Sequence, residues 1–171
     1  VICTEKNAWD SFVAGVYWNS QIGESTALQV QFDRLFYYNN NPSSYINRFV
    51  NLDFESIQNV GISKRTPIDM YVAKFDFNYS VSDHVKLDAG VKFLESGLKN
   101  TVKLETDRPD LILVDDDMYG TFHLNESIKA AYLSSQSSMR HNISLSAGLR
   151  WEHTQTDLQN EEDELLVNRN Y

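Results

Sequence analysis

The sequence predicts an all-β protein, an antiparallel meander of about six to eight amphipathic strands. Apolar and polar residues alternate strictly through Lys74–Val81 and again through Val85–Phe93, with a short polar turn between the two segments. This alternation is the period of a β-strand, because successive side chains point to opposite faces of a sheet. Helical periodicity is missing from almost the whole chain. The chain therefore reads as a series of hairpins.

The N-terminal part predicts one hairpin followed by a loop. Residues 11–19 and 26–38 alternate, and Gly23 between them can adopt the positive φ that a turn requires. Asn39–Ser44 is expected to be a loop, since Pro42 cannot donate a hydrogen bond to a strand ladder. Residues 45–61 fit no single period, so they predict one poorly specified strand.

Four longer strands are expected in the remainder of the chain. Thr66-Pro67 is expected to break the chain before the first of them. The four strands are 68–81, 85–104, 119–135 and 142–154, with a loop at 107–117 and a turn at 137–140. In the third strand, one face carries Phe122, Leu124, Ile128, Ala130 and Tyr132. Residues 155–171 are expected to be an acidic loop leading into a further strand.

The segregation of the two strand faces permits two fold families. A soluble sandwich would bury the apolar face against a second sheet, whereas an outer-membrane barrel would place it in lipid and the charged face in a wet lumen. The connections favour the barrel. Tight turns near Gly23, Asp83 and Ser138 alternate with long polar loops near Asn40, Asp107 and Glu161, as the short periplasmic turns and longer extracellular loops of such barrels do.

Composition excludes several function classes. The formal net charge is −9 and no cluster of Lys and Arg occurs, which argues against a nucleic-acid partner. Cys3 is the single cysteine, so no intrachain disulfide can form. The sequence has no glycine-flanked serine nucleophile, no phosphate-binding glycine loop and no histidine spacing typical of zinc. We therefore expect no enzyme and no cofactor.

Four segments resemble the C-terminal barrel region of TonB-dependent-receptor-like outer-membrane proteins of the Bacteroidetes type. The segments are Lys74–Val81, Val85–Phe93, Glu126–Tyr132 and Ala147–Thr154, in that order. The resemblance is strongest over 68–154, and Asn168–Tyr171 is similar to the start of that family's next strand. Residues 1–61 show only a compatible hairpin pattern.

The resemblance implies that residues 1–171 are one segment of a barrel of about 22 strands in the bacterial outer membrane, plugged by a separate N-terminal domain. It implies import of a nutrient driven by a TonB-type energy-coupling protein, which would contact a region N-terminal to this segment. The partners expected are outer-membrane lipid and the rest of the barrel and plug. The alternative is a soluble β-barrel or β-sandwich binding module.

Two sets of residues are candidates for the surfaces of such a barrel. The expected lumen-facing residues are Lys74, Asp76, Asn78, Lys86, Asp88, Lys92, Arg150 and Glu152. Aromatic residues near the expected strand ends are either an interfacial girdle or the core of a sandwich. These aromatic residues are Trp18, Phe36, Tyr71, Phe93, Tyr132 and Trp151.

A calcium site is the one metal hypothesis. Asp115, Asp117 and Glu126 occupy positions 1, 3 and 12 of an EF-hand-like loop, but Tyr119 stands at a ligand position and no amphipathic helix flanks the loop. An acidic loop is the simpler interpretation, with weak calcium binding as the alternative. In isolation, a barrel segment with free edges and an uncovered apolar face is expected to self-associate.

Overall fold

The structure, a computed structural model, describes residues 2–50, 55–108, 120–139, 143–160 and 164–171. These residues form eight strands in one antiparallel sheet, so the expected all-β architecture is confirmed. The strands are β1 (Ile2–Glu5), β2 (Ala8–Ile22), β3 (Thr26–Val50), β4 (Glu55–Ser82), β5 (Val85–Thr106), β6 (Gly120–Met139), β7 (Ile143–Gln159) and β8 (Leu165–Asn170). No helix in the described ranges is long and apolar enough to span a bilayer.

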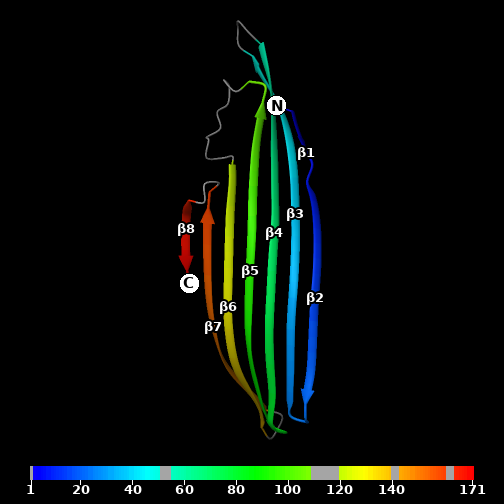
Figure 1. Ribbon diagram of the computed structural model, residues 1–171, viewed down its shortest axis with the longest axis vertical. Helices are drawn as coiled ribbons and strands as arrows, with labels where there is room; N and C mark the ends of the chain where they lie inside the picture. Colours follow the sequence, from blue (N-terminus) through cyan, green and yellow to red (C-terminus); the bar gives the residue numbers. More distant parts are fainter. Residues whose placement is uncertain (1, 51–54, 109–119, 140–142, 161–163) are drawn as a thin grey trace.

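From β2 onward, strands that follow each other in the chain are neighbours in the sheet. From β3 to β8 the order is sequential, while β1 and β2 pair with successive parts of the same edge of β3. The hairpins β2–β3 and β4–β5 turn at one end of the sheet (Figure 1), which we call the turn end; the opposite end is the loop end. β4 has 28 residues, about 90 Å of extended chain, which far exceeds what a tilted strand needs to cross a bilayer.

Pro42 lies within β3, so the loop expected at Asn39–Ser44 is wrong. The carbonyl of Pro42 accepts a hydrogen bond of 3.1 Å from the backbone N–H of Lys6, at the break between β1 and β2. The amide nitrogen and carbonyl of one residue point to the same side of an antiparallel strand. The missing N–H of Pro42 therefore faces that break, and the ladder with β4 loses no donor there.

Pro67 is likewise accommodated inside a strand, so the expected break at Thr66-Pro67 is also wrong. β4 continues through it, while the β4–β5 pairing passes from Arg65 opposite Thr101 to Ile68 opposite Leu98. Because the β4–β5 ladder is interrupted at this point, no hydrogen bond between these strands depends on the N–H that Pro67 lacks. The single strand expected over 45–61 is in fact the end of β3 and the start of β4, which pair with each other.

The C-terminal strands are longer than their alternation predicts. β6 continues to Met139 through most of the expected turn, and β7 continues to Gln159. The acidic loop expected over 155–171 is therefore strand at both of its ends, since β8 pairs with the last part of β7. The strand expected to begin near residue 168 begins at Leu165.

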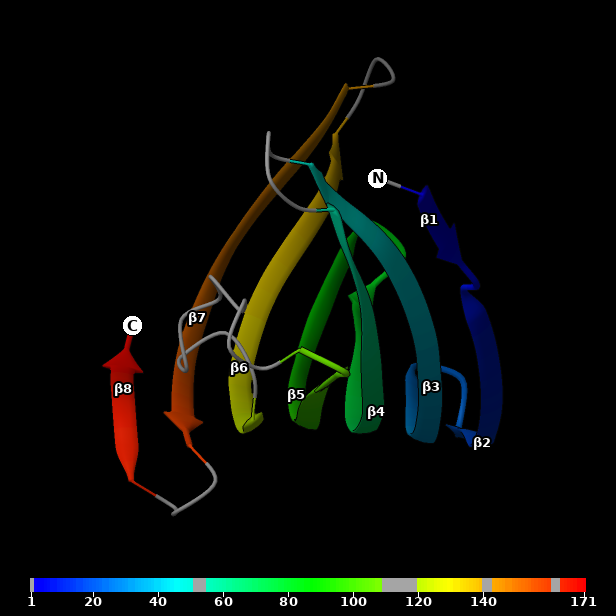
Figure 2. The ribbon, with the colours of Figure 1, turned by 90° about the horizontal axis from the view of Figure 1, so that it is seen from above.

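The sheet curves into an open arc with β1 and β2 at one edge and β8 at the other (Figure 2). Residues opposite each other on paired strands share a face, so the register assigns a face to every paired residue. Most of the buried side chains in the described ranges share the face of Asp76; they are Asn39, Gln58, Thr66, Asp76 and Ala130. Side chains converge on the inner side of a curved sheet. We therefore call this face concave and the opposite one convex.

Candidate functional site on the two faces of the sheet

All the residues predicted to face a lumen share the concave face. The register pairs Lys74 with Lys92, and Asn78 with Asp88, and it carries the same face across to β7 through Tyr132 opposite Arg150. The full set on this face is Lys74, Asp76, Asn78, Lys86, Asp88, Lys92, Arg150 and Glu152. The alternation of each strand was thus sufficient to group them.

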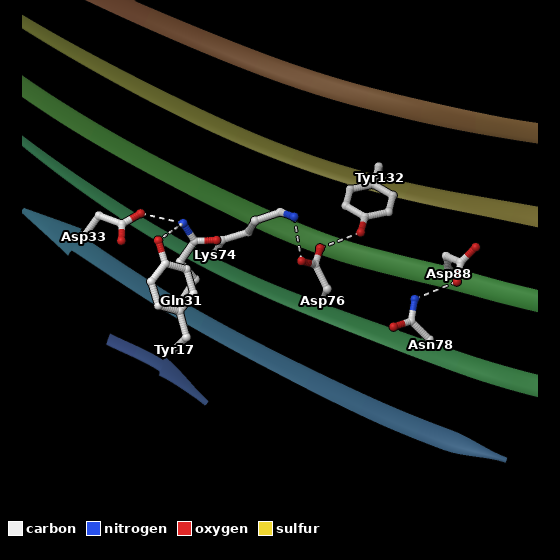
Figure 3. Close-up of polar contacts among 8 residues, drawn as sticks. All are labelled: Tyr17, Gln31, Asp33, Lys74, Asp76, Asn78, Asp88 and Tyr132. Atoms are coloured by element: carbon white, nitrogen blue, oxygen red, sulfur yellow. Dashed lines mark hydrogen bonds and ion pairs between the residues drawn. The ribbon is translucent and has the colours of Figure 1, made fainter. Parts of the chain in front are cut away.

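Asp76 is the centre of the polar contacts on the concave face (Figure 3). Its carboxylate lies 2.7 Å from Nζ of Lys74 and accepts a hydrogen bond of 2.5 Å from the hydroxyl of Tyr132. Asp76 is 5% exposed, so its charge needs these partners. Tyr132 belongs to β6 and Asp76 to β4, and the ring crosses β5 at Gly90. A Cβ on Gly90 would lie 2.4 Å from Cε1 of that ring.

Other charges on the concave face are also paired locally. The side-chain amide of Asn78 donates to Asp88 at 2.6 Å, and the guanidinium of Arg150 lies 2.5 Å from Glu152. On β3, the side-chain amide of Gln31 donates to Asp33 at 2.5 Å and to the Tyr17 hydroxyl at 3.4 Å. Tyr17, Gln31, Asp33 and Tyr132 were not among the residues predicted to face a lumen, and Tyr132 was expected in the aromatic girdle. Only their strand parity relative to Lys74 could have indicated that they lie on the same face.

The convex face carries an apolar band next to the turn end. On β7 the band runs from Ile143 to Trp151, nine residues of strand, which matches the 9–11 residues of a tilted membrane-crossing strand. Its side chains are exposed, with Leu149 82% and Val16 70% accessible. On the central strands the band includes Val30, Phe32, Phe75, Phe77, Ala89, Val91 and Leu133. Within this band the convex face is apolar, whereas the concave face on the other side of the same strands carries charged residues.

The aromatic residues proposed as a girdle divide between the two faces. Trp18, Phe36, Tyr71, Phe93 and Trp151 lie on the convex face. Tyr132 does not, because it lies on the concave face and binds Asp76. Arg34 stands at the border of the band toward the loop end, where its guanidinium lies 3.1 Å from Asp69 and 5.4 Å from the centre of the Tyr71 ring.

The convex face changes from apolar to polar toward the loop end, while the concave face gains apolar residues there. Beyond Tyr71 and Phe93, the convex face carries polar and charged residues. The concave face there carries the apolar residues Ile68, Met70, Val72, Leu94, Leu98, Leu124 and Ile128, interspersed with polar residues that include Thr66, Ser96, Asn100 and Glu126. This explains the apolar face expected on β6: Phe122, Leu124, Ile128, Ala130 and Tyr132 share the face of Asp76, not that of Phe75. The apolar band of the convex face therefore covers only the part of the strands next to the turn end.

Near the loop end, Asp107 ties the end of β5 to β4. Its carboxylate accepts hydrogen bonds from the backbone N–H of Asn59 at 2.9 Å and from the Asn59 side-chain amide at 2.7 Å. These donors favour the ionised form, the backbone N–H most strongly, and lower the pKa of Asp107 below its ordinary value. The contact is therefore complete at neutral pH and is lost only as the pH falls through that lowered pKa.

The calcium hypothesis is not tested by the structure. Asp115 and Asp117 lie outside the described residues, and Glu126 lies on the concave face of β6. Within the described ranges, no group of three or more His, Cys, Asp or Glu side chains is arranged to hold a metal ion.

Comparison with known proteins agrees with this geometry. A family model described as "Outer membrane protein beta-barrel family" matches residues 23–171, which is most of the chain. A comparison with curated proteins gave no match. The family match indicates a location in the bacterial outer membrane, where strands with one apolar and one polar face form barrel walls. The chain belongs to the outer membrane protein β-barrel family.

Proposed function

We propose that this chain forms part of the wall of an outer-membrane transporter of the TonB-dependent-receptor kind, as found in Bacteroidetes, which imports a nutrient. The concave face lines the wet interior and the convex band contacts lipid. In this role the chain supplies wall and lumen surface and performs no catalysis.

The observation that carries the proposal is the pairing of charges on the concave face. Asp76, Asp88 and Glu152 each have a polar partner on the sheet itself. Such a face suits a water-filled interior, because a charge facing lipid at the bilayer midplane costs about 2–4 kcal/mol for Arg or Lys. The convex band offers lipid no charge between Ile143 and Trp151, where the alternate residues are Leu145, Ala147 and Leu149.

The open edges of the sheet support the proposed partners. β2 and residues 143–153 of β7 each present a row of backbone N–H and C=O groups without a neighbouring strand in the described sheet, since β8 pairs only with the end of β7. Within a bilayer these groups need partners, so we propose that further strands of the barrel pair with both edges. The plug and the TonB-type coupling protein are the further partners proposed. When isolated in water, the segment would pair its edges or its apolar faces with a second copy.

A soluble binding module is the other function compatible with alternating strands. It would bury the convex band in a core, but Leu149 and Val16 are largely exposed in the curved sheet. The family match and the exposed band together favour the barrel.

The test of the proposed function is energised uptake by cells. Cells with and without the protein are compared for accumulation of iron chelates, cobalamin and oligosaccharides, before and after a protonophore collapses the proton gradient. We expect accumulation of at least one compound class to require both the protein and the gradient. Accumulation that survives the protonophore would indicate passive diffusion, and a panel unaffected by loss of the protein would contradict import.

A further inference from the structure

The concave face carries two rows of apolar side chains between the polar contacts of Asp76 and the loop end. The rows cross β4, β5 and β6, and together we call them the apolar patch. They are Val72, Leu94 and Ile128 and, four residues nearer the loop end, Ile68, Leu98 and Leu124. All six side chains are half-buried, so part of each remains accessible from the inside of the arc. Accessible apolar surface on an otherwise polar wall marks a site for an apolar ligand or partner.

A cation without an ion pair borders the apolar patch. Lys92 is half-buried and precedes Leu94 by two residues, on the same face of β5. The residue opposite it is Lys74, whose Nζ lies 2.7 Å from the carboxylate of Asp76 (Figure 3). Lys92 itself makes no ion pair within the described part of the chain. Like charges directly opposite each other on paired strands are destabilising, so an anion beside Lys92 would stabilise this wall.

The charges around the apolar patch orient a ligand. Glu126 of β6 lies between the two apolar rows and would repel an anionic group there. The anionic group therefore belongs at Lys92, and the apolar part of the ligand points toward the loop end. From Val72 to Ile68, β4 spans about 13 Å. This is close to the length of one acyl chain, about 15 Å or half the hydrocarbon core of a bilayer.

We propose that the concave face binds an amphipathic carboxylate such as a medium-chain fatty acid, with its carboxylate at Lys92 and its chain along the apolar patch. The ammonium group of Lys92 donates charge-assisted hydrogen bonds to the carboxylate. Each methylene that is buried against the patch contributes roughly a fourfold gain in affinity. The inference rests on the proposed function only in placing the concave face inside the barrel.

The test uses the full-length protein in phospholipid nanodiscs and decanoic acid that carries a photoreactive diazirine at its far end. After illumination, mass spectrometry of peptides identifies the residues to which the probe is attached. With the carboxylate at Lys92, attachment is expected around Ile68 and Leu98. Probe dissolved in the lipid is expected to attach to the convex band, at positions such as Leu133 and Leu149, and supplies an internal reference. The quantity measured is the ratio of attachment at the patch to attachment at the band.

Lys92→Gln is expected to lower this ratio about tenfold, which is the effect of losing one hydrogen bond between charged groups. The corresponding alcohol with the same diazirine is expected to give an equally low ratio with the wild type. Lys86→Gln is the matched control and is expected to leave the ratio unchanged. Lys86 is a second concave cation of β5 without an ion pair in the described ranges, and it lies six residues farther from the patch.

Equal ratios for the wild type and Lys92→Gln, or for the acid and the alcohol, would overturn the proposal. Absence of attachment at the patch in the full-length protein would also overturn it, because the proposed plug or another segment would then cover the patch. Attachment of the alcohol to the concave face and not to the convex band would contradict the face assignment, and with it both this proposal and the proposed function. A negative uptake panel alone would contradict import but leave this site standing.

Discussion

Replacing Ala147 with arginine is expected to destabilise the folded protein in lipid by about 2–4 kcal/mol. Ala147 lies on the convex face at the middle of the band on β7, opposite Ser135. The guanidinium there would face hydrocarbon near the midplane. The free energy of unfolding from phospholipid vesicles, followed by tryptophan fluorescence against denaturant, measures the effect.

The adjacent residue supplies the matched control. Ser146 is one position along the same strand, on the concave face opposite Gln136, and is exposed. Ser146→Arg is expected to cost less than about 1 kcal/mol, because its side chain would enter the wet interior. Equal costs for the two arginines would contradict the assignment of the faces, and a larger cost at Ser146 would reverse it.

Replacing Gly90 with alanine is expected to destabilise the protein by about 3 kcal/mol. The new Cβ would lie 2.4 Å from Cε1 of Tyr132 and 2.7 Å from Oδ1 of Asp76, so the ring must move. Overpacking of this kind costs about 1–3 kcal/mol, and losing a hydrogen bond to a charged group adds about 1.5–3 kcal/mol. Unfolding from vesicles measures the sum.

Gly97→Ala on the same strand is the control, because its Cβ would meet only Asn125 Oδ1, at an ordinary 3.5 Å. We expect a change within about 0.5 kcal/mol there. Tyr132→Phe separates the cost of the lost hydrogen bond from the cost of overpacking, since it removes the hydrogen bond to Asp76 without adding a Cβ at Gly90. If Gly90→Ala is no more costly than Gly97→Ala, Tyr132 does not cross β5 at Gly90 in the folded protein.

The sequence was sufficient to predict the alternating central part of the strands and the grouping of the charged residues, because both follow from a period of two. To place Lys74, Asp88 and Glu152 on one face, it was enough to know which residues alternate within each strand and where the turns between strands lie. The strand breaks expected at Pro42 and Pro67 were wrong because the outcome depends on the neighbouring strand and not on the local sequence. Pro42 and Pro67 end strands only when a partner needs their N–H, and the break between β1 and β2 removes that need at Pro42.

The change of polarity along the convex face is visible in the sequence. On β4, the odd residues Tyr71 and Phe75 are apolar while Asp69 and Arg65, at the same parity, are charged. In the proposed barrel, such a switch would mark the height at which the surroundings of the convex face change from lipid to water. The contact between Tyr132 and Asp76 could not be predicted, because it joins strands that are not adjacent and depends on the absence of a side chain at Gly90.

Accessibility of single cysteines in intact outer membranes tests the face assignment most directly. In a Cys3→Ser background, cysteine is placed at Ser146 on the concave face and at Ala89 or Ala147 on the convex band. A charged, water-soluble maleimide is expected to label Ser146→Cys readily, and to label the two alanine positions only after detergent replaces the lipid. Ready labelling of Ala89→Cys and Ala147→Cys in the membrane, with Ser146→Cys protected, would contradict a wet concave face and a lipid-facing convex band.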